Sequence, residues 1–68
     1  MARVNARRLR QLREDMGYSQ EELAQRAGLK SGTIYKMESG KNNNPGLQTL
    51  TAIAKVLGVS VIDLISEN

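Results

Sequence analysis

The sequence contains neither cysteine nor histidine, and its only aromatic residues are two tyrosines. Without these two residue types, disulfide bonds, thiol nucleophiles and the common zinc sites are excluded. The usual general base of enzymes near neutral pH is missing as well. No apolar run approaches the roughly 18–20 residues of a membrane span, and the first residues lack a signal-peptide core. We therefore expect a cytoplasmic protein with no membrane contact and no metal or small-molecule cofactor.

With 68 residues, the chain has room for one small domain, which we assign to residues 1–68. Apolar residues recur at spacings of three and four, and glycines separate the repeats. No stretch alternates with period two for long enough to form a convincing strand. These patterns predict an all-α fold of five short helices.

Three of the predicted helices lie outside the central pair. The first covers about residues 5–16 and turns Leu9, Leu12 and Met16 inward. The fourth covers residues 47–57 and ends at a glycine. Its predicted apolar stripe consists of Leu47, Leu50, Ile53, Ala54 and Leu57. A last short helix starts at Ser60, whose side chain is predicted to cap it with Asp63 as the acidic partner.

The two central helices are predicted over residues 20–27 and about 31–38. Ser19 and Glu22 have the spacing of a capping box, which marks the start of the first of them. In the second, Ile34 and Met37 have the spacing of an inward face. A tight turn containing a glycine joins the pair, which is the arrangement of a helix-turn-helix over about residues 19–40.

Several short motifs occur here in the order and spacing of a known family. They are "SQEELA" from residue 19, "AGL" from residue 27, "ESGK" from residue 38 and "LGVS" from residue 57. From about Leu9 to Ile65, the sequence resembles the DNA-binding domains of the Cro/lambda-repressor-type (XRE-like) helix-turn-helix family. The resemblance implies a compact five-helix, lambda-repressor-like domain that binds operator DNA as a two-fold dimer, with its third helix in the major groove.

The resemblance also implies which residues contact DNA. The candidates for reading bases are Ser31, Gly32, Tyr35 and Lys36. The candidates for contacting the DNA backbone are Ser19, Gln20, Lys30, Thr33, Lys41, Asn42, Asn43 and Asn44. Contacts to phosphate set position and salt dependence, whereas contacts to base edges set sequence preference.

At other positions the resemblance implies a structural role, or this sequence differs from the family. Arg13 and Glu38 match a family pair in which an ion pair ties the first helix to the end of the third, and exposed surface charge is the alternative for both. Gly32 stands where the family often has a hydrogen-bonding side chain, so it has no side chain to contact a base. Tyr35 is large for its position, and packing over the preceding helix is the alternative to a DNA contact. Ile62 stands at a usually polar position, so we expect Ile62 and Ile65 to join two subunits.

The charges are unevenly distributed along the chain. Residues 1–13 carry five arginines and no acid, and residues 30–41 sum to +2, within a net charge of +3. Residues 14–29 sum to −3. Positive charge near the predicted recognition helix suits a polyanion such as double-stranded DNA.

Two other function classes remain open from the sequence. A protein-interaction module, such as an antitoxin or co-regulator, would keep the fold with weak or no specific DNA binding, and Gly32 and the acidic stretch favour it. An enzyme would have only carboxylates available, and these cluster where helix capping explains them. A sequence-specific transcriptional regulator, as a repressor that binds a roughly palindromic operator as a homodimer, is the leading hypothesis. The sequence does not separate restriction-modification controllers, antitoxins and phage regulators.

Overall fold

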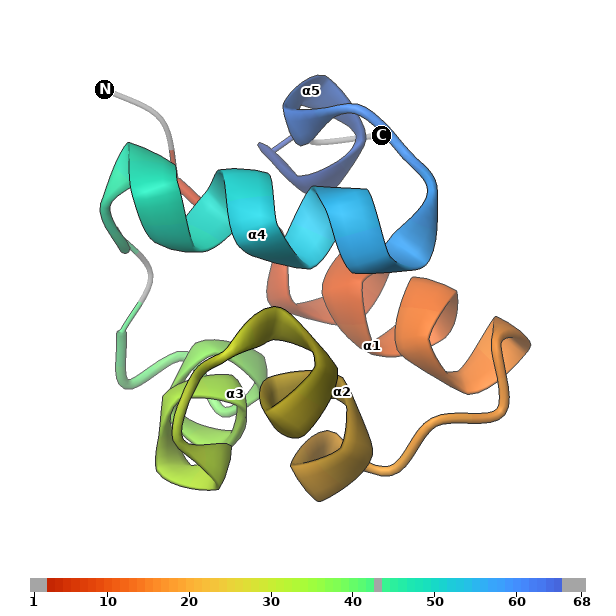
Figure 1. Cartoon of the computed structure of the whole chain (residues 1–68). Coiled ribbons are helices and arrows are strands. Elements are labelled where there is room, and N and C mark those ends of the chain that lie inside the picture. Colours follow the sequence, from red (N-terminus) through yellow and green to blue (C-terminus); the bar gives the residue numbers. More distant parts are fainter. Residues whose placement is uncertain (1–2, 43, 66–68) are drawn as a thin grey trace.

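A computed structural model of the chain describes residues 3–42 and 44–65. These residues form five α-helices and no strand. The helices are α1 (Ala6–Asp15), α2 (Gln20–Ala27), α3 (Ser31–Glu38), α4 (Leu47–Leu57) and α5 (Val61–Ile65). In Figure 1, α2 and α3 lie together at one end of the molecule and α4 and α5 at the other. Because α1 packs against both α3 and α5, it connects the two ends, and the predicted all-α fold is confirmed.

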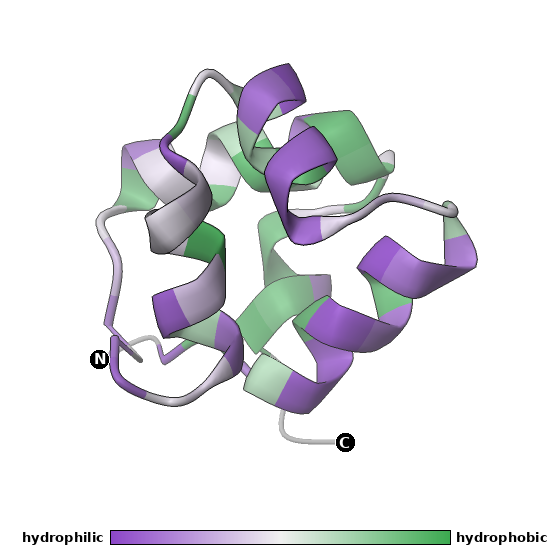
Figure 2. Ribbon diagram, turned by 90° about the horizontal axis from the view of Figure 1, so that it is seen from below, coloured by the Kyte–Doolittle hydropathy of each residue, from purple (hydrophilic) through white to green (hydrophobic). Residues whose placement is uncertain are grey.

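Every helix contributes at least one fully buried side chain to a common core. The largest of these side chains are Leu9, Leu23, Ile34, Met37, Ile53 and Leu64. Figure 2 shows hydrophobic and hydrophilic residues alternating in bands along the helices, as expected for helices with one buried side. Val4, which the sequence patterns did not single out, is also buried. Beside it, the backbone N–H of Asn5 donates to the carbonyl of Leu64 at 2.7 Å, which fastens the start of α1 to α5.

The predicted capping box at the start of α2 is present. The Ser19 hydroxyl accepts from the Glu22 backbone N–H at 3.0 Å, and the Glu22 carboxylate accepts from the Ser19 N–H at 2.9 Å. This bond to the Ser19 backbone lowers the pKa of the Glu22 carboxyl. The cap therefore pairs two of the backbone groups that a helix start leaves without intrahelical partners.

Two apolar side chains that were predicted to face inward are exposed, and one that was predicted at a subunit interface is half-buried. Met16 is 47% exposed, because it follows the last residue of α1 and lies beyond the core. Leu47 is 70% exposed, because it is the first residue of α4 and extends past the side chains beneath that helix. Ile65 is half-buried and packs against the core, so Ile62, at 70% exposure, is the strongly exposed apolar residue of α5. An apolar stripe is thus buried only where a neighbouring helix lies under it.

Candidate nucleic-acid interface

The turn between α2 and α3 depends on Gly28. Gly28 has φ +72°, and the next residue, Leu29, donates its N–H to the carbonyl of Ala24 at 2.7 Å. A side chain at this φ would cost about 1–2 kcal/mol, so glycine suits the position. Ala24 is 1% exposed, and Leu29 packs partly against the core. This turn holds α3 directly against α2, as in the predicted helix-turn-helix.

One side of α3 packs into the core, and the opposite side is accessible. Ile34 and Met37 are fully buried, whereas Ser31, Gly32, Tyr35 and Lys36 are exposed. These four exposed residues are the base-reading candidates. The structure therefore brings these candidates together on one accessible surface.

Gly32 is not required by the fold. It lies in the first turn of α3 without a positive φ, and a Cβ built there meets no atom within 4 Å. Neither backbone geometry nor packing explains glycine at this position. The absence of a side chain matters only for what approaches α3 from outside.

The backbone candidates differ in accessibility. Lys30, Lys41 and Asn44 are exposed, whereas Thr33 and Asn42 are half-buried. The Asn42 N–H donates to the carbonyl of Lys36 at 3.0 Å, so the loop after α3 stays close to that helix. Asn43 lies outside the described residues.

The two candidates at the start of α2 already make hydrogen bonds within the protein. The exposed Ser19 hydroxyl accepts from Glu22 and keeps its own hydrogen available. The half-buried Gln20 donates one amide N–H to the Glu38 carboxylate at 3.0 Å. The second amide hydrogen of Gln20 remains for another acceptor.

Arg13 and Glu38 form an ion pair between α1 and α3. The Arg13 Nε donates to Glu38 Oε2 at 2.6 Å, and its Nη2 donates to Glu38 Oε1 at 3.0 Å. Arg13 Nη1 also donates to the Tyr18 carbonyl at 2.6 Å. The two side chains are only 10% and 5% exposed, and the bond to Glu38 raises the pKa of Arg13. Together with Gln20, this network fixes the end of α3 relative to α1 and α2.

The network also determines the charge of the accessible surface. Residues 30–41 contain three lysines and a single acid, Glu38. The lysines are exposed, whereas the Glu38 side chain is buried and neutralised by Arg13. The accessible surface of this segment is consequently more positive than its net charge of +2 suggests.

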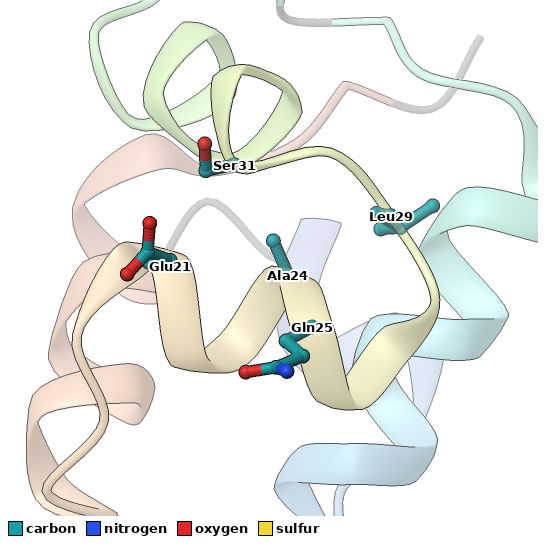
Figure 3. A pocket seen from close by; sticks show the side chains of 5 residues that line it. All are labelled: Glu21, Ala24, Gln25, Leu29 and Ser31. Atoms are coloured by element: carbon teal, nitrogen blue, oxygen red, sulfur yellow. The ribbon is translucent and has the colours of Figure 1, made fainter.

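A shallow open hollow borders this surface between α2 and the start of α3. Figure 3 shows the residues that line it, which are Glu21, Ala24, Gln25, Leu29 and Ser31. Glu21 and Gln25 were not among the predicted contact residues, and no sequence pattern distinguishes them from other polar helix residues. Across residues 3–42 and 44–65, no group of three acidic side chains could hold a metal ion. None of the helices in these ranges is long and apolar enough to cross a membrane.

Comparison with known proteins agrees with this geometry. A helix-turn-helix family model matches residues 9–64. The transcriptional regulator SinR of Bacillus subtilis is 38% identical over 60 residues, which are 88% of this chain and 54% of SinR. The chain thus spans about half the length of this relative.

Two solved structures of SinR are also similar. The N-terminal DNA-binding domain of SinR from Bacillus subtilis has a TM-score of 0.88 and 36% identity, over 93% of this chain and 91% of that one. SinR in complex with DNA has a TM-score of 0.80 and 38% identity, over 82% of this chain and 89% of that one. The turn at Gly28, the buried side of α3 and the match over residues 9–64 all lead to one conclusion. This chain belongs to the helix-turn-helix family of DNA-binding domains, whose homologous members include transcriptional regulators.

Proposed function

We propose that this chain binds double-stranded DNA with α3 in the major groove and acts as a sequence-specific transcriptional regulator. The observation that carries the proposal is the accessible surface of residues 30–41, where three lysines are exposed and the single acid is buried in an ion pair. Such a surface provides counter-charges for phosphates beside the side chains that can reach base edges. The similarity to SinR, a structure of which contains DNA, supports the same function. We assign no catalytic role to the chain.

The proposed contacts divide into two groups. Lys30, Lys41 and the start of α2 position the protein on the phosphate backbone, where the helix amides favour an anion. Ser31, Tyr35 and Lys36 reach base edges from the exposed side of α3. Gly32 allows the helix backbone to approach the groove closely, because it has no side chain between them.

We further propose that two copies bind a roughly palindromic operator and repress by covering a promoter. In such a complex, the two α3 helices read half-sites about 34–36 Å apart. Ile62, which is 70% exposed, is the proposed centre of the contact between subunits, with Ile65 beside it. A contact that removes the exposed part of Ile62 from water would contribute about 1–2 kcal/mol per side chain to the dimer.

Fluorescence anisotropy with labelled duplexes tests the proposal. The chain is titrated with random-sequence DNA at two salt concentrations, and bound sequences are then selected from a random pool. We expect salt-dependent binding and one enriched sequence. Lys36→Met should weaken binding more than Lys55→Met, which removes the same charge from the last turn of α4. Absence of binding even at low salt would contradict the proposal and favour a protein-interaction module.

A further inference from the structure

Tyr35 and Lys41 contact each other on the surface that we propose binds DNA. The Lys41 Nζ lies 5.5 Å from the centre of the Tyr35 ring. This distance is within the roughly 6 Å at which an ammonium is attracted to an aromatic face. Tyr35 is 50% exposed and Lys41 is exposed, so the contact faces solvent.

The chain after α3 folds back to make this contact possible. Lys41 follows Tyr35 by six residues, which is beyond the spacing of three or four at which side chains meet along a helix. Gly40, at φ +83°, reverses the backbone, and its N–H donates to the Met37 carbonyl at 3.3 Å. Two residues further on, the Asn42 N–H donates to the Lys36 carbonyl at 3.0 Å. The position of Lys41 is therefore set by the turn as well as by its own side chain.

The ring is the partner of the Lys41 ammonium in the free protein. In the part of the chain that the structure describes, the ion pairs join Arg10 to Glu14 and Arg13 to Glu38. An ammonium has three N–H donors, so one side can rest on the ring while the other donates to a phosphate oxygen. Fixing a lysine side chain costs about 2 kcal/mol of conformational entropy. A partner that already restricts Lys41 in the free protein reduces the part of this cost that DNA binding has to overcome.

We propose that Tyr35 is a positioning residue for Lys41: its ring face holds the ammonium ready to bind a DNA phosphate. This inference rests on the proposed DNA binding and gives Tyr35 a role that a base contact does not require. In this proposal, the face of the Tyr35 ring increases the affinity for DNA, and the Tyr35 hydroxyl is not required. The effect of Tyr35 on affinity should consequently depend on the presence of Lys41.

A double-mutant cycle with Tyr35→Leu and Lys41→Met tests this dependence on a duplex of fixed sequence. Leucine is a good helix former at this exposed position, so the fold should be kept and can be checked by circular dichroism. With Lys41 present, Tyr35→Leu should weaken binding about two- to fivefold, as expected for an exposed cation–π contact. In the Lys41→Met background, the same change should have almost no effect. Tyr35→Phe keeps the ring and should restore most of the affinity.

A measurement without DNA separates this inference from the proposed function. In the free protein, the ring should shift the NMR signals of the Lys41 ε-methylene protons upfield, in the wild type and Tyr35→Phe but not in Tyr35→Leu. The inference is wrong if this shift is absent, if Tyr35→Leu costs the same with and without Lys41, or if Tyr35→Phe binds as weakly as Tyr35→Leu. A shifted Lys41 signal in a wild type that binds no DNA would instead refute the proposed function, and the phosphate role of Lys41 with it.

Discussion

Replacing Arg13 by methionine should destabilise the fold strongly. The substitution removes two hydrogen bonds to Glu38 and one to the Tyr18 carbonyl. It leaves the Glu38 carboxylate, whose side chain is 5% exposed, with the Gln20 amide as its remaining donor. Methionine keeps the apolar stem of the side chain, so the loss reports the guanidinium rather than a cavity.

The expected loss follows from this burial. Removing one partner of a buried ion pair costs about 3–5 kcal/mol. A fold of 68 residues has a total free energy of unfolding of roughly 3–10 kcal/mol, so the substitution should remove from about a third of this stability to all of it. Urea titration followed by circular dichroism measures the difference, with a stabilising osmolyte added if the variant has no folded baseline. The double variant Arg13→Met/Glu38→Leu should recover part of the loss, because it no longer buries an unpaired charge.

Two results would contradict this reasoning. If Arg13→Met lowers the free energy of unfolding by less than about 1 kcal/mol, the ion pair contributes no more than an exposed pair does. The burial of the pair would then not increase its contribution. A double variant no more stable than Arg13→Met would show that Arg13 acts through the Tyr18 carbonyl alone. Arg10→Met is the matched control, because the Arg10–Glu14 pair on the same helix is exposed and should contribute little.

Three further predictions concern single positions. Gly32→Gln should change the free energy of unfolding by no more than an ordinary surface substitution, about 0.5 kcal/mol, yet select a different DNA sequence from a random pool; selection of the wild-type sequence would contradict the proposed close approach. Ile62→Ser should abolish dimers in sedimentation equilibrium while Leu47→Ser, at the same 70% exposure, keeps them; a wild type that is monomeric throughout the micromolar range would refute the proposed interface. The pKa of Glu22 is lowered in the folded state, so its carboxylate stabilises the fold above about pH 4.3. This stabilisation is lost as the pH falls through the folded-state pKa. The difference in free energy of unfolding between the wild type and Glu22→Gln should therefore shrink on acidification. A difference that stays constant from pH 7 to the acid limit would show that the Glu22 charge is not responsible.

The helices could be predicted from the sequence because their ends have local signals. Ser19 and Glu22 are three residues apart, and Gly28 marks a stop, so the bounds of α2 follow from neighbouring residues alone. Ile34 and Met37 identify the buried side of α3 for the same reason. The exposed base-reading candidates then follow, since they lie on the side of that helix opposite to these two residues.

The contacts between segments could not be predicted in this way. Met16 and Leu47 fit the helical spacing of their neighbours, but burial depends on whether another helix lies beneath them. The Tyr35–Lys41 contact depends on the direction of the chain after Gly40, which helical periodicity does not describe. The pairing of Arg13 with Glu38, 25 residues apart, came from a family resemblance and not from a local pattern.

The shortness of α3 ties the proposed DNA reading to the stability of the whole molecule. A helix of eight residues is not stable alone in water, so α3 exists only while Ile34 and Met37 are docked in the shared core. Melting of α3 would therefore expose Ile34 and Met37 and disrupt the core that all five helices share. Heat and substitutions as distant as α5 should weaken DNA binding to the extent that they unfold the chain.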